Sequence, residues 1–411
     1  MLKNYFKIAI AVLRRRKFFT FISLFGISFT LTILIVLTAF VDNVISPNYP
    51  EVNRDKSLYI TSVRQLDKNH GQRTGPASFW YLDHYVNSLK TPAKVAISSF
   101  FTPTNTYVNN KKLVINLKFT NYEFWEVMQY DFIEGKPYTA QQIQNSERVA
   151  VISEETRNNF FGNVPAIGKY IEADNVQYRV TGVVKSVPVT MLVSYADLYV
   201  PYTVSKTDYK QKKLEGSYTA VILPAAEEDL PKIQAEYAAV VAKIKPEDKN
   251  FDRFVSVADS YFISFLRTTP FGGEEDGGAG KLMMIIALIV LLFMLLPALN
   301  LININISRIM ERSSEIGVRK AFGASGKTLV GQFIVENMIL TFLGCVIGLA
   351  LSFVILQIIN SSDLISHMQL RINFTVLIFS ILACLVFGFL SGVYPAWRMS
   401  RVQVVTALKA Q

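Results

Sequence analysis

Long apolar runs dominate the hydrophobic pattern of this chain. Four of them contain no lysine or arginine: Phe18–Val41, Leu282–Leu299, Met338–Ile359 and Phe374–Val393. Each reaches the roughly 18 to 20 residues that a helix rising about 1.5 Å per residue needs to cross about 30 Å of hydrocarbon. One such run could be the core helix of a soluble protein, but four of them predict four transmembrane helices.

The segment between the first and second runs has the shorter patterns of a mixed domain. Leu113–Phe119 alternates with a period of two, and Arg148–Ile152 and Tyr178–Val184 are also typical of strands. Ser153 can N-cap a short helix, and the apolar residues of Leu230–Ile244 recur mostly at helical spacing. The expected fold class is an α-helical membrane protein with four transmembrane helices and a large α/β (α+β) extracytoplasmic domain inserted between the first and second helices.

The boundaries of the expected regions follow from these patterns. Residues 272–280 (GGEEDGGAG) form either an acidic hinge or a plain flexible linker before the second membrane helix. In chain order we expect an N-terminal segment 1–17, transmembrane helix 18–42, the extracytoplasmic domain 43–280, transmembrane helix 281–306, a charged coupling segment 307–331, transmembrane helix 332–359, a short loop 360–373, transmembrane helix 374–394 and a C-terminal tail 395–411.

Charge predicts the orientation of these helices. The formal net charge is +10, and the surplus lies before the first run, between the second and third, and after the fourth. Residues 43–281 are neutral, with 27 Lys/Arg and 27 Asp/Glu. The positive-inside bias therefore places both termini and the 307–331 segment in the cytoplasm and the large domain outside. Topology accounts for the basic surplus, so no nucleic-acid partner is expected.

Two features bear on the compartment of the large domain. The first apolar run exceeds the h-region of a signal peptide and no A-x-A-like site follows it, so we expect a retained anchor. The two cysteines, Cys345 and Cys384, both lie in predicted membrane helices. The large domain is therefore expected to hold together without disulfides, which a segment of about 240 residues can do.

The charged segment between the second and third runs is predicted to be helical. Glu311, Glu315 and Arg319 are four residues apart and share one helix face. Gly323 suits the end of that helix, and Ser325 can N-cap the next one. A cytoplasmic helix tied at both ends to membrane helices is a candidate docking site for a partner; a helix lying passively on lipid is the alternative.

Candidate catalytic chemistry is sparse. Residues 321–328 loosely resemble a P-loop, but the βαβ context that a P-loop needs is not predicted around them. The three histidines are isolated, and neither H-E-x-x-H nor G-x-S-x-G occurs. We therefore expect a non-enzymatic chain that binds no cofactor or metal.

Two GxxxG motifs lie in the last two apolar runs. Gly344 with Gly348 and Gly388 with Gly392 would permit close helix approach within the chain or between subunits. The ordinary abundance of glycine in membrane helices explains them equally well. Glu336, at the start of the third run, either pairs with a basic residue of the charged segment or lies at the membrane interface.

The charged segment resembles the coupling signature of the MacB/FtsX superfamily of ABC transporter permeases. Residues 311–325 (ERSSEIGVRKAFGAS) are similar to the pattern ER..EIG.RKA.GAS. Residues 392–408 resemble the ending G.YPA.RA....P..AL, with Gln403 or Val404 where proline is usual. The stretch from Phe132 to Val184 resembles the periplasmic core domain of the family.

The resemblance implies a permease in the bacterial inner membrane that works as a dimer with a second copy or a related permease. A separate cytoplasmic ABC ATPase dimer would bind ATP and Mg²⁺, and its closure would move a coupling helix at about residues 308–322. The membrane helices would relay this motion to the periplasmic domain, a mechanism called mechanotransmission. The expected ATPase-coupling residues are Glu311, Glu315, Ile316, Gly317, Arg319, Lys320, Ala321 and Gly323.

Three functions stay open at this point. The first is ATP-driven efflux or export of an envelope substrate such as a peptide, an antibiotic or a lipoprotein. The second is an FtsX-type regulator that controls envelope hydrolases without transport, and the third is a membrane-anchored receptor without an ATPase. Membrane lipid, a periplasmic adaptor and an outer-membrane channel are the further partners to consider.

Overall fold

The structure is a computed structural model that divides into two compact units. It describes residues 10–11, 15, 17–68, 71–91, 93–108, 111–162, 164–206, 209–267, 278–311, 318, 322, 325–362 and 366–400. One unit, here called the helical unit, comprises residues 1–42, 281–364 and 369–411. The other, here called the α/β unit, comprises residues 43–280 and 365–368.

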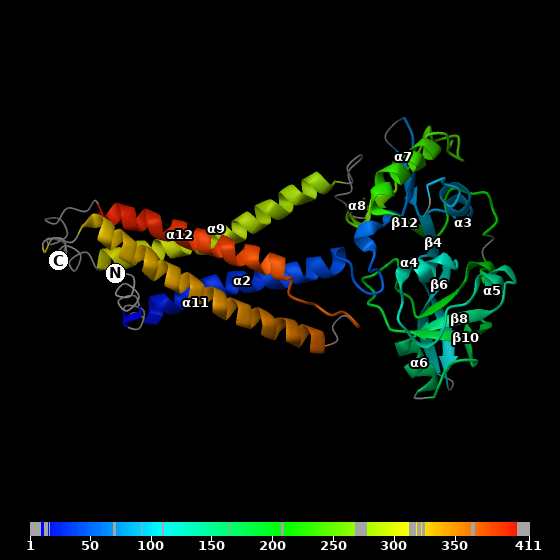
Figure 1. Cartoon of the computed structure of the whole chain (residues 1–411), viewed down its shortest axis with the longest axis horizontal. Helices are drawn as coiled ribbons and strands as arrows, with labels where there is room; N and C mark the ends of the chain where they lie inside the picture. Colours follow the sequence, from blue (N-terminus) through cyan, green and yellow to red (C-terminus); the bar gives the residue numbers. More distant parts are fainter. Residues whose placement is uncertain are drawn as a thin grey trace. The chain divides into compact units, whose positions relative to one another are not determined.

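Within the part of the chain that the structure describes, four long helices build the helical unit (Figure 1). Each of the four predicted apolar runs lies in one of them: α2 (Lys17–Ile45), α9 (Ala279–Glu311), α11 (Gly326–Ser361) and α12 (Phe374–Ser400). Among the described residues, Lys17–Ile45 and Val330–Ser361 are long and apolar enough to cross a membrane, and Ala279–Ile289 and Phe374–Leu390 are shorter apolar stretches. The number of spans therefore stays a prediction.

The helices extend beyond the apolar runs at the charged segment. Helix α9 continues to Glu311, and α11 begins at Gly326 rather than at the start of its apolar run. Ser325 is the N-cap of α11, as predicted, because its hydroxyl accepts a hydrogen bond from Thr328 N at 3.2 Å. Polar residues outside the apolar runs can continue a helix, since the helical hydrogen bonds need no apolar surroundings.

A mixed sheet, with eleven strands among the described residues, forms the centre of the α/β unit. Its order is β14-β1-β12-β4-β6-β11-β8-β10-β7, with β5 paired to β6 and β9 paired to β10. The pairs β8/β10 and β6/β11 are parallel, and the other pairs are antiparallel. The strands are β1 (Leu58–Ile60), β4 (Ala93–Ser99), β5 (Thr102–Val108), β6 (Lys111–Thr120), β7 (Phe132–Gly135), β8 (Val149–Ser153), β9 (Tyr170–Ala173), β10 (Val176–Val184), β11 (Leu198–Pro201), β12 (Tyr218–Pro224) and β14 (Asp259–Ser260).

A second sheet and several short helices complete this unit. The second sheet has the order β13-β2-β3, with β2 (Val63–Leu66), β3 (Gln72–Gly75) and β13 (Arg253–Ser256). The predicted strands are confirmed in β6, β8 and β10, and the predicted helices in α6 and α7. The helical elements are η1 (Arg54–Lys56), α3 (Phe79–Tyr81), η2 (Leu82–Val86), α4 (Glu123–Met128), α5 (Ala140–Gln144), α6 (Glu154–Phe161), η3 (Tyr202–Val204), η4 (Glu227–Asp229), α7 (Leu230–Val241) and α8 (Tyr261–Arg267).

Alternation along the strands distributes the core over both faces of the large sheet. In β1, Leu58 and Ile60 pack in the cluster that contains α7, whereas Tyr59 between them packs in the cluster around α4. A third cluster consists mainly of buried side chains from β6, β8, β9, β10 and β11. Where both faces are covered, as in β1 and β8, every residue of the strand is buried. The α/β unit therefore has a core of its own.

Candidate functional site

Seven of the eight expected coupling residues lie outside the described residues. The structure describes the end of α9 at Glu311, the isolated residues Val318 and Phe322, and Ser325. Phe322 N donates to Val318 O at 3.0 Å, the spacing of a helical turn, and the Phe322 side chain is 89% exposed. The remaining expected coupling residues lie outside the described part: Glu315, Ile316, Gly317, Arg319, Lys320, Ala321 and Gly323.

The first GxxxG motif lies where α11 meets α2. A Cβ atom added to Gly344 would lie 2.7 Å from Ile27 Cγ2, and one added to Gly348 would lie 2.9 Å from the carbonyl oxygen of Ser28. Thr32 of α2 also donates to Gly348 O at 3.1 Å. The two glycines therefore bring the helix backbones close enough for a hydrogen bond between helices.

One glycine of the second motif lies at another helix contact in the same chain. A Cβ atom on Gly388 of α12 would lie 2.9 Å from Thr341 Cγ2 of α11, and Asn337 donates its side-chain amide to Gly388 O. Glu336, the residue before Asn337 in α11, is also buried. Gly392 is helical, and its surroundings lie outside the described part.

The α/β unit contains a buried ionic cluster that sequence reasoning missed. We call it the joint, and it consists of Glu51, Arg54, Tyr59, Lys118, Ser194 and Tyr261. Arg54 is only 1% exposed, and its Nε donates to Glu51 Oε2 at 3.1 Å. Burial opposes the charge of the guanidinium, but the Glu51 carboxylate raises the pKa of Arg54 above its ordinary value.

Arg54 forms hydrogen bonds with the backbone at the C-terminal end of α2. Its Nη1 donates to Val44 O at 2.7 Å and to Ser46 O at 2.9 Å. Val44 lies in the last turn of α2, whose carbonyl groups have no partners within the helix. A cation is favoured at that end of a helix, so the guanidinium supplies both hydrogen bonds and favourable charge.

The same guanidinium also contacts the start of α8. Its central carbon lies 4.1 Å from the centroid of the Tyr261 ring, the geometry of a cation–π interaction. Tyr261 is the first residue of α8, which precedes the segment leading to α9. Arg54 thus contacts the C-terminal end of α2 and the helix that comes before α9.

Glu51 ties Arg54 to the sheet and to the loop before β11. Its Oε1 accepts from Ser194 Oγ at 2.7 Å, and its Oε2 accepts from the Tyr59 hydroxyl at 3.3 Å. Tyr59 lies in β1. Every oxygen of the buried carboxylate therefore has a partner, which is the condition under which a buried charge is tolerated.

Lys118 on β6 brings a second buried cation close to Glu51. It is 0% exposed, and its Nζ donates to three carbonyl oxygens: Ser99 at 2.9 Å, Leu192 at 3.2 Å and Val193 at 2.8 Å. An ammonium has three donors, so all three are used. Burial lowers the pKa of Lys118 to about 7, against the raising effect of Glu51.

Few features of the sequence point to the joint. Lys118 lies in a strand that also contains Asn116, and Glu51 and Arg54 are three residues apart after the first apolar run. Neither feature names its partners. Among the described residues, no group of three or more His, Cys, Asp or Glu side chains could hold a metal ion.

Two family models match the chain in sequence order. The model of the MacB-like periplasmic core domain matches residues 20–240, and that of the FtsX-like permease C-terminal region matches residues 287–404. The first covers more than half of the chain. The charged segment lies inside the second match.

Three curated proteins illustrate the relationship. The "Macrolide export ATP-binding/permease protein MacB" of Pasteurella multocida (strain Pm70) is 24% identical over 290 residues, which are 70% of this chain and 42% of that protein. The "Pyoverdine export ATP-binding/permease protein PvdT" of Pseudomonas aeruginosa is 24% identical over 296 residues, 71% of this chain and 42% of that protein. The "Uncharacterized ABC transporter permease YknZ" of Bacillus subtilis (strain 168) is 22% identical over 279 residues, 67% of this chain and 65% of that protein. The chain thus spans less than half the length of the MacB and PvdT relatives.

Two solved structures are also similar. The extracellular domain of YknZ matches with a TM-score of 0.35 and 19% identity, covering 44% of this chain and 91% of that structure. The periplasmic region of MacB from Actinobacillus actinomycetemcomitans matches with a TM-score of 0.37 and 14% identity, covering 52% of this chain and 94% of that structure.

Proposed function

This chain belongs to the MacB/FtsX superfamily of ABC transporter permeases, and we propose that it couples ATP hydrolysis by a cytoplasmic ATPase to movement of its α/β unit. The observation that carries this proposal is the order of two family regions on one chain. A MacB-like core domain comes first, and an FtsX-like region that contains the charged segment follows it.

The charged segment is the proposed docking site of the ATPase. The segment joins α9 to α11, so a force applied to it acts on two long helices at once. The exposed aromatic ring of Phe322 supports a role in contacting a partner, because aromatic residues are enriched at protein interfaces. ATP and Mg²⁺ would be bound by the ATPase dimer and no cofactor by the permease.

The joint is the proposed entry point of motion into the α/β unit. Arg54 contacts the last turn of α2, Ser46 just after it, and the first residue of α8. A displacement of either connection would act on the guanidinium and, through Glu51, on β1 and the loop that contains Ser194. This arrangement supports mechanotransmission, in which the membrane helices move the domain without carrying substrate themselves.

Export of an envelope substrate is the activity we favour. The MacB and PvdT relatives are named for export of macrolides and pyoverdine, two unrelated compounds. We therefore propose export as the class of activity, and the candidate substrates remain a peptide, an antibiotic or a lipoprotein. We place the chain in the bacterial inner membrane with both termini cytoplasmic, acting as a dimer, with an adaptor and an outer-membrane channel as further partners.

Affinity purification of the full chain from its native membranes tests the proposal. We expect an ABC ATPase to co-purify, and ATP hydrolysis by the purified complex to drive substrate release in membrane vesicles. Absence of an ATPase would favour a receptor and contradict the proposal. An ATPase that co-purifies but supports hydrolase activation without any transport would favour the FtsX-type regulator.

A further inference from the structure

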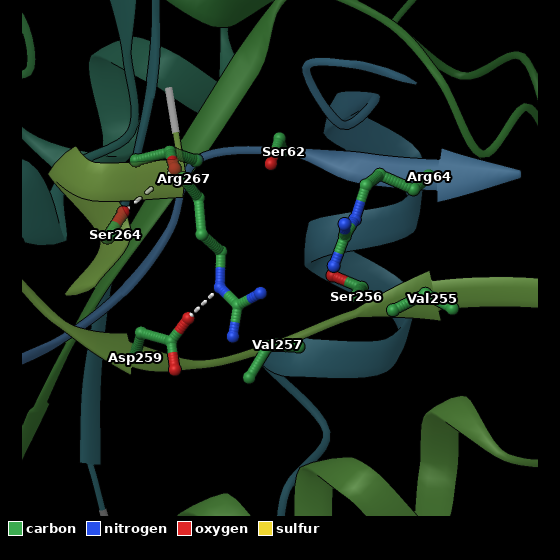
Figure 2. Close-up of a pocket in the computed structure, with 9 residues that line it drawn as sticks. Ser62, Arg64, Val255, Ser256, Val257, Asp259, Ser264 and Arg267 are labelled. Carbon is green, nitrogen blue, oxygen red and sulfur yellow. Dashed lines mark hydrogen bonds and ion pairs between the residues drawn. The ribbon is translucent and has the colours of Figure 1, made fainter. Parts of the chain in front are cut away.

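The α/β unit contains two cavities that differ in the room they offer to a ligand. The smaller one lies between the second sheet and α8, and Figure 2 shows Arg64 and Arg267 on opposite sides of it. Its volume is about 10 Å³, which is the space that one water molecule requires. Arg267 already pairs with Asp259, with Nε and Oδ2 2.5 Å apart. This cavity therefore has no room for an organic ligand.

The larger cavity has a volume of about 260 Å³, and we call it the hydroxyl pocket. Its lining comes from β5, β6, β10, the turn between β9 and β10, and the residues around η3. These elements all belong to the α/β unit. The lining includes Thr102, Thr104, Phe119, Asp174, Tyr178 and Lys206.

One side of the hydroxyl pocket is apolar. Leu117 and Tyr178 are buried members of the third core cluster, and Phe119 and Val204 are partly buried against it. Two of these four side chains are aromatic, so they present flat apolar faces. A ligand in the pocket would cover apolar surface that the chain itself leaves partly open.

The hydroxyl group of Tyr178 needs a partner that the described part of the chain does not supply. Tyr178 is only 2% exposed, and it lines the pocket. Among the described residues, no group forms a hydrogen bond with this hydroxyl. Buried tyrosine hydroxyls normally have a hydrogen-bond partner. We therefore expect the partner to lie within the pocket.

Strand β5 adds a row of hydroxyl groups. Thr102, Thr104 and Thr106 alternate along this strand, and side chains two residues apart lie on the same face of a sheet. Thr102 pairs with Leu117 of β6, so the row stands beside the apolar side of the pocket. Thr106 donates its hydroxyl to Glu172 O. The hydroxyls of Thr102 and Thr104 have no such partner among the described residues and line the pocket.

The charged groups of the lining neutralise each other. Lys206 Nζ lies 2.6 Å from Asp174 Oδ2 and donates to the backbone oxygen of Asp174 at 2.8 Å. These two are the charged residues of a lining that the structure describes completely, so its net charge is zero. An ion that entered would lose water and gain no free counter-charge. The lining therefore favours an uncharged molecule.

We propose that the hydroxyl pocket binds a small uncharged molecule with several hydroxyl groups, namely a single sugar ring. Its volume equals that of about nine water molecules, which suits one ring and excludes a larger ligand. Hydroxyls both donate and accept, so those of a sugar can pair with Tyr178 and with the threonines in either direction. The C–H face of the ring can lie against Phe119.

A free sugar and the terminal residue of a larger glycan both present this chemistry. The site lies in the α/β unit alone, so it does not depend on the proposed function of the permease.

Saturation-transfer difference NMR of the full chain tests the pocket, because it detects weak ligands through their own protons. The detergent must lack a sugar headgroup, since such a headgroup would compete for the site. The probes are glucose, galactose, mannose and N-acetylglucosamine. We expect transfer to the C–H protons of at least one of them. A trisaccharide that ends in the same sugar then distinguishes the sources: transfer to its terminal ring indicates a glycan end, and transfer to the free sugar alone indicates a free sugar.

Two variants and a matched control make the test specific. Tyr178→Phe removes only the hydroxyl and should weaken sugar binding roughly fivefold, the effect of losing one hydrogen bond. It should not lower the thermal stability of the unliganded chain, because the hydroxyl has no partner there. Ser217→Trp, at an exposed position of the lining, should block the pocket. Tyr170→Phe on β9, 61% exposed and outside the lining, should bind as the wild type does.

Four results would overturn the proposal. Absence of transfer to all four sugars would exclude the ligand class, and transfer that both pocket variants leave unchanged would place the binding elsewhere. Preference for an N-acetylated amino-acid amide over every sugar would show that the pocket takes peptide groups. A clear loss of stability in Tyr178→Phe would show that the hydroxyl has a partner in the protein.

Discussion

Arg54 is the residue on which the contacts of the joint converge. It is almost completely buried, and it bonds to a carboxylate, to two backbone carbonyls and to an aromatic ring. A buried ion pair gains little net free energy, because desolvation offsets the attraction between the charges. Removing one partner is costly all the same, because the other charge is then left buried and unpaired. The joint should therefore be sensitive to single substitutions and tolerant of paired ones.

Replacing Arg54 with methionine should lower the free energy of unfolding of the α/β unit by about 3–5 kcal/mol, because Glu51 is left without its counter-charge. Denaturant unfolding, followed by tryptophan fluorescence, measures the change. The double variant Arg54→Met/Glu51→Gln should lose less than the sum of the two single variants.

Lys206 provides the matched control for that experiment. It pairs with Asp174, but the two side chains are 61% and 46% exposed. Lys206→Met should therefore change stability by less than about 1 kcal/mol. A loss of similar size at Lys206 and Arg54 would contradict the argument from burial.

Lys118 should make the stability of the α/β unit depend on pH. Its pKa is lowered from 10.5 to about 7 in the folded state, so between these values the unfolded chain binds more protons than the folded chain. The free energy of unfolding should therefore rise from pH 7 toward pH 10, by at most about 1.4 kcal/mol per pH unit. Below pH 7 this contribution is constant.

Denaturant titrations at several pH values up to 9 measure this slope, below the range in which tyrosines titrate. Lys118→Met should flatten the curve, and Lys206→Met should leave it parallel to the wild type. Parallel curves for Lys118→Met and the wild type would show that the buried ammonium does not titrate in this range.

At the scale of elements, the helical unit depends on close contacts of α11 with α2 and with α12. Gly348 accepts a hydrogen bond from Thr32 through its carbonyl group, and Gly388 accepts one from Asn337. Two helix backbones can approach this closely only where a residue has no side chain, as in glycine. A glycine therefore matters for packing when it lies at a contact between helices, whatever the number of glycines in the helix.

Gly348→Ala should destabilise the helical unit, because the added methyl group would meet Ser28 O at 2.9 Å and Leu31 Cβ at 3.1 Å. We expect a loss of about 1–3 kcal/mol from overpacking. Gly331→Ala in the same helix is the control: its Cβ would meet nothing within 4 Å, so helix propensity alone should make it neutral or slightly stabilising. Thermal unfolding in one detergent compares the two, and equal effects would contradict the packing role.

Substitutions in the charged segment should test its predicted role in coupling. Gly317→Trp, or the reversal Glu315→Arg/Arg319→Glu, should weaken ATPase binding about tenfold or more, the cost of losing an interface hot spot. Co-purification and ATP-driven transport are the measurements. Lys232→Glu, a charge reversal on the exposed side of α7, should change neither. Normal assembly and transport in the segment variants would refute the docking role.

In the whole molecule, the two units differ in how much of their apolar surface they bury. The α/β unit buries three clusters of its own, drawn from residues 58–258. The helical unit exposes many large apolar side chains on α2, α9, α11 and α12, as expected of helices that face lipid. Only the α/β unit should therefore be soluble by itself.

A fragment of residues 43–280 should fold in water without the helical unit. It retains Val44 and Ser46, the acceptors of Arg54. A fragment that begins at residue 47 lacks both acceptors and should be less stable by about 1–3 kcal/mol. Near-ultraviolet circular dichroism and denaturant unfolding compare the two fragments. An unstructured longer fragment would contradict the independence of this core.

Local patterns were sufficient for a large part of this description. Four apolar runs predicted the four long helices, alternation predicted β6, and strand-like segments predicted β8 and β10. Ser325 was predicted and confirmed as an N-cap. The signature at residues 311–325 led to the family that the two matches then showed. Each of these features depends on residues that are close together in the sequence, so it can be recognised without the fold.

The joint and the glycine contacts were decided only by the tertiary structure. Glu51 bonds to Ser194 across 143 positions, and Thr32 bonds to Gly348 across 316. No periodicity links residues so far apart, and a buried charge looks the same in sequence as a solvated one. Which charges are buried, which glycines lie at contacts and which arginines share a cavity depend on how distant elements pack, because burial and hydrogen bonding are properties of the folded surroundings.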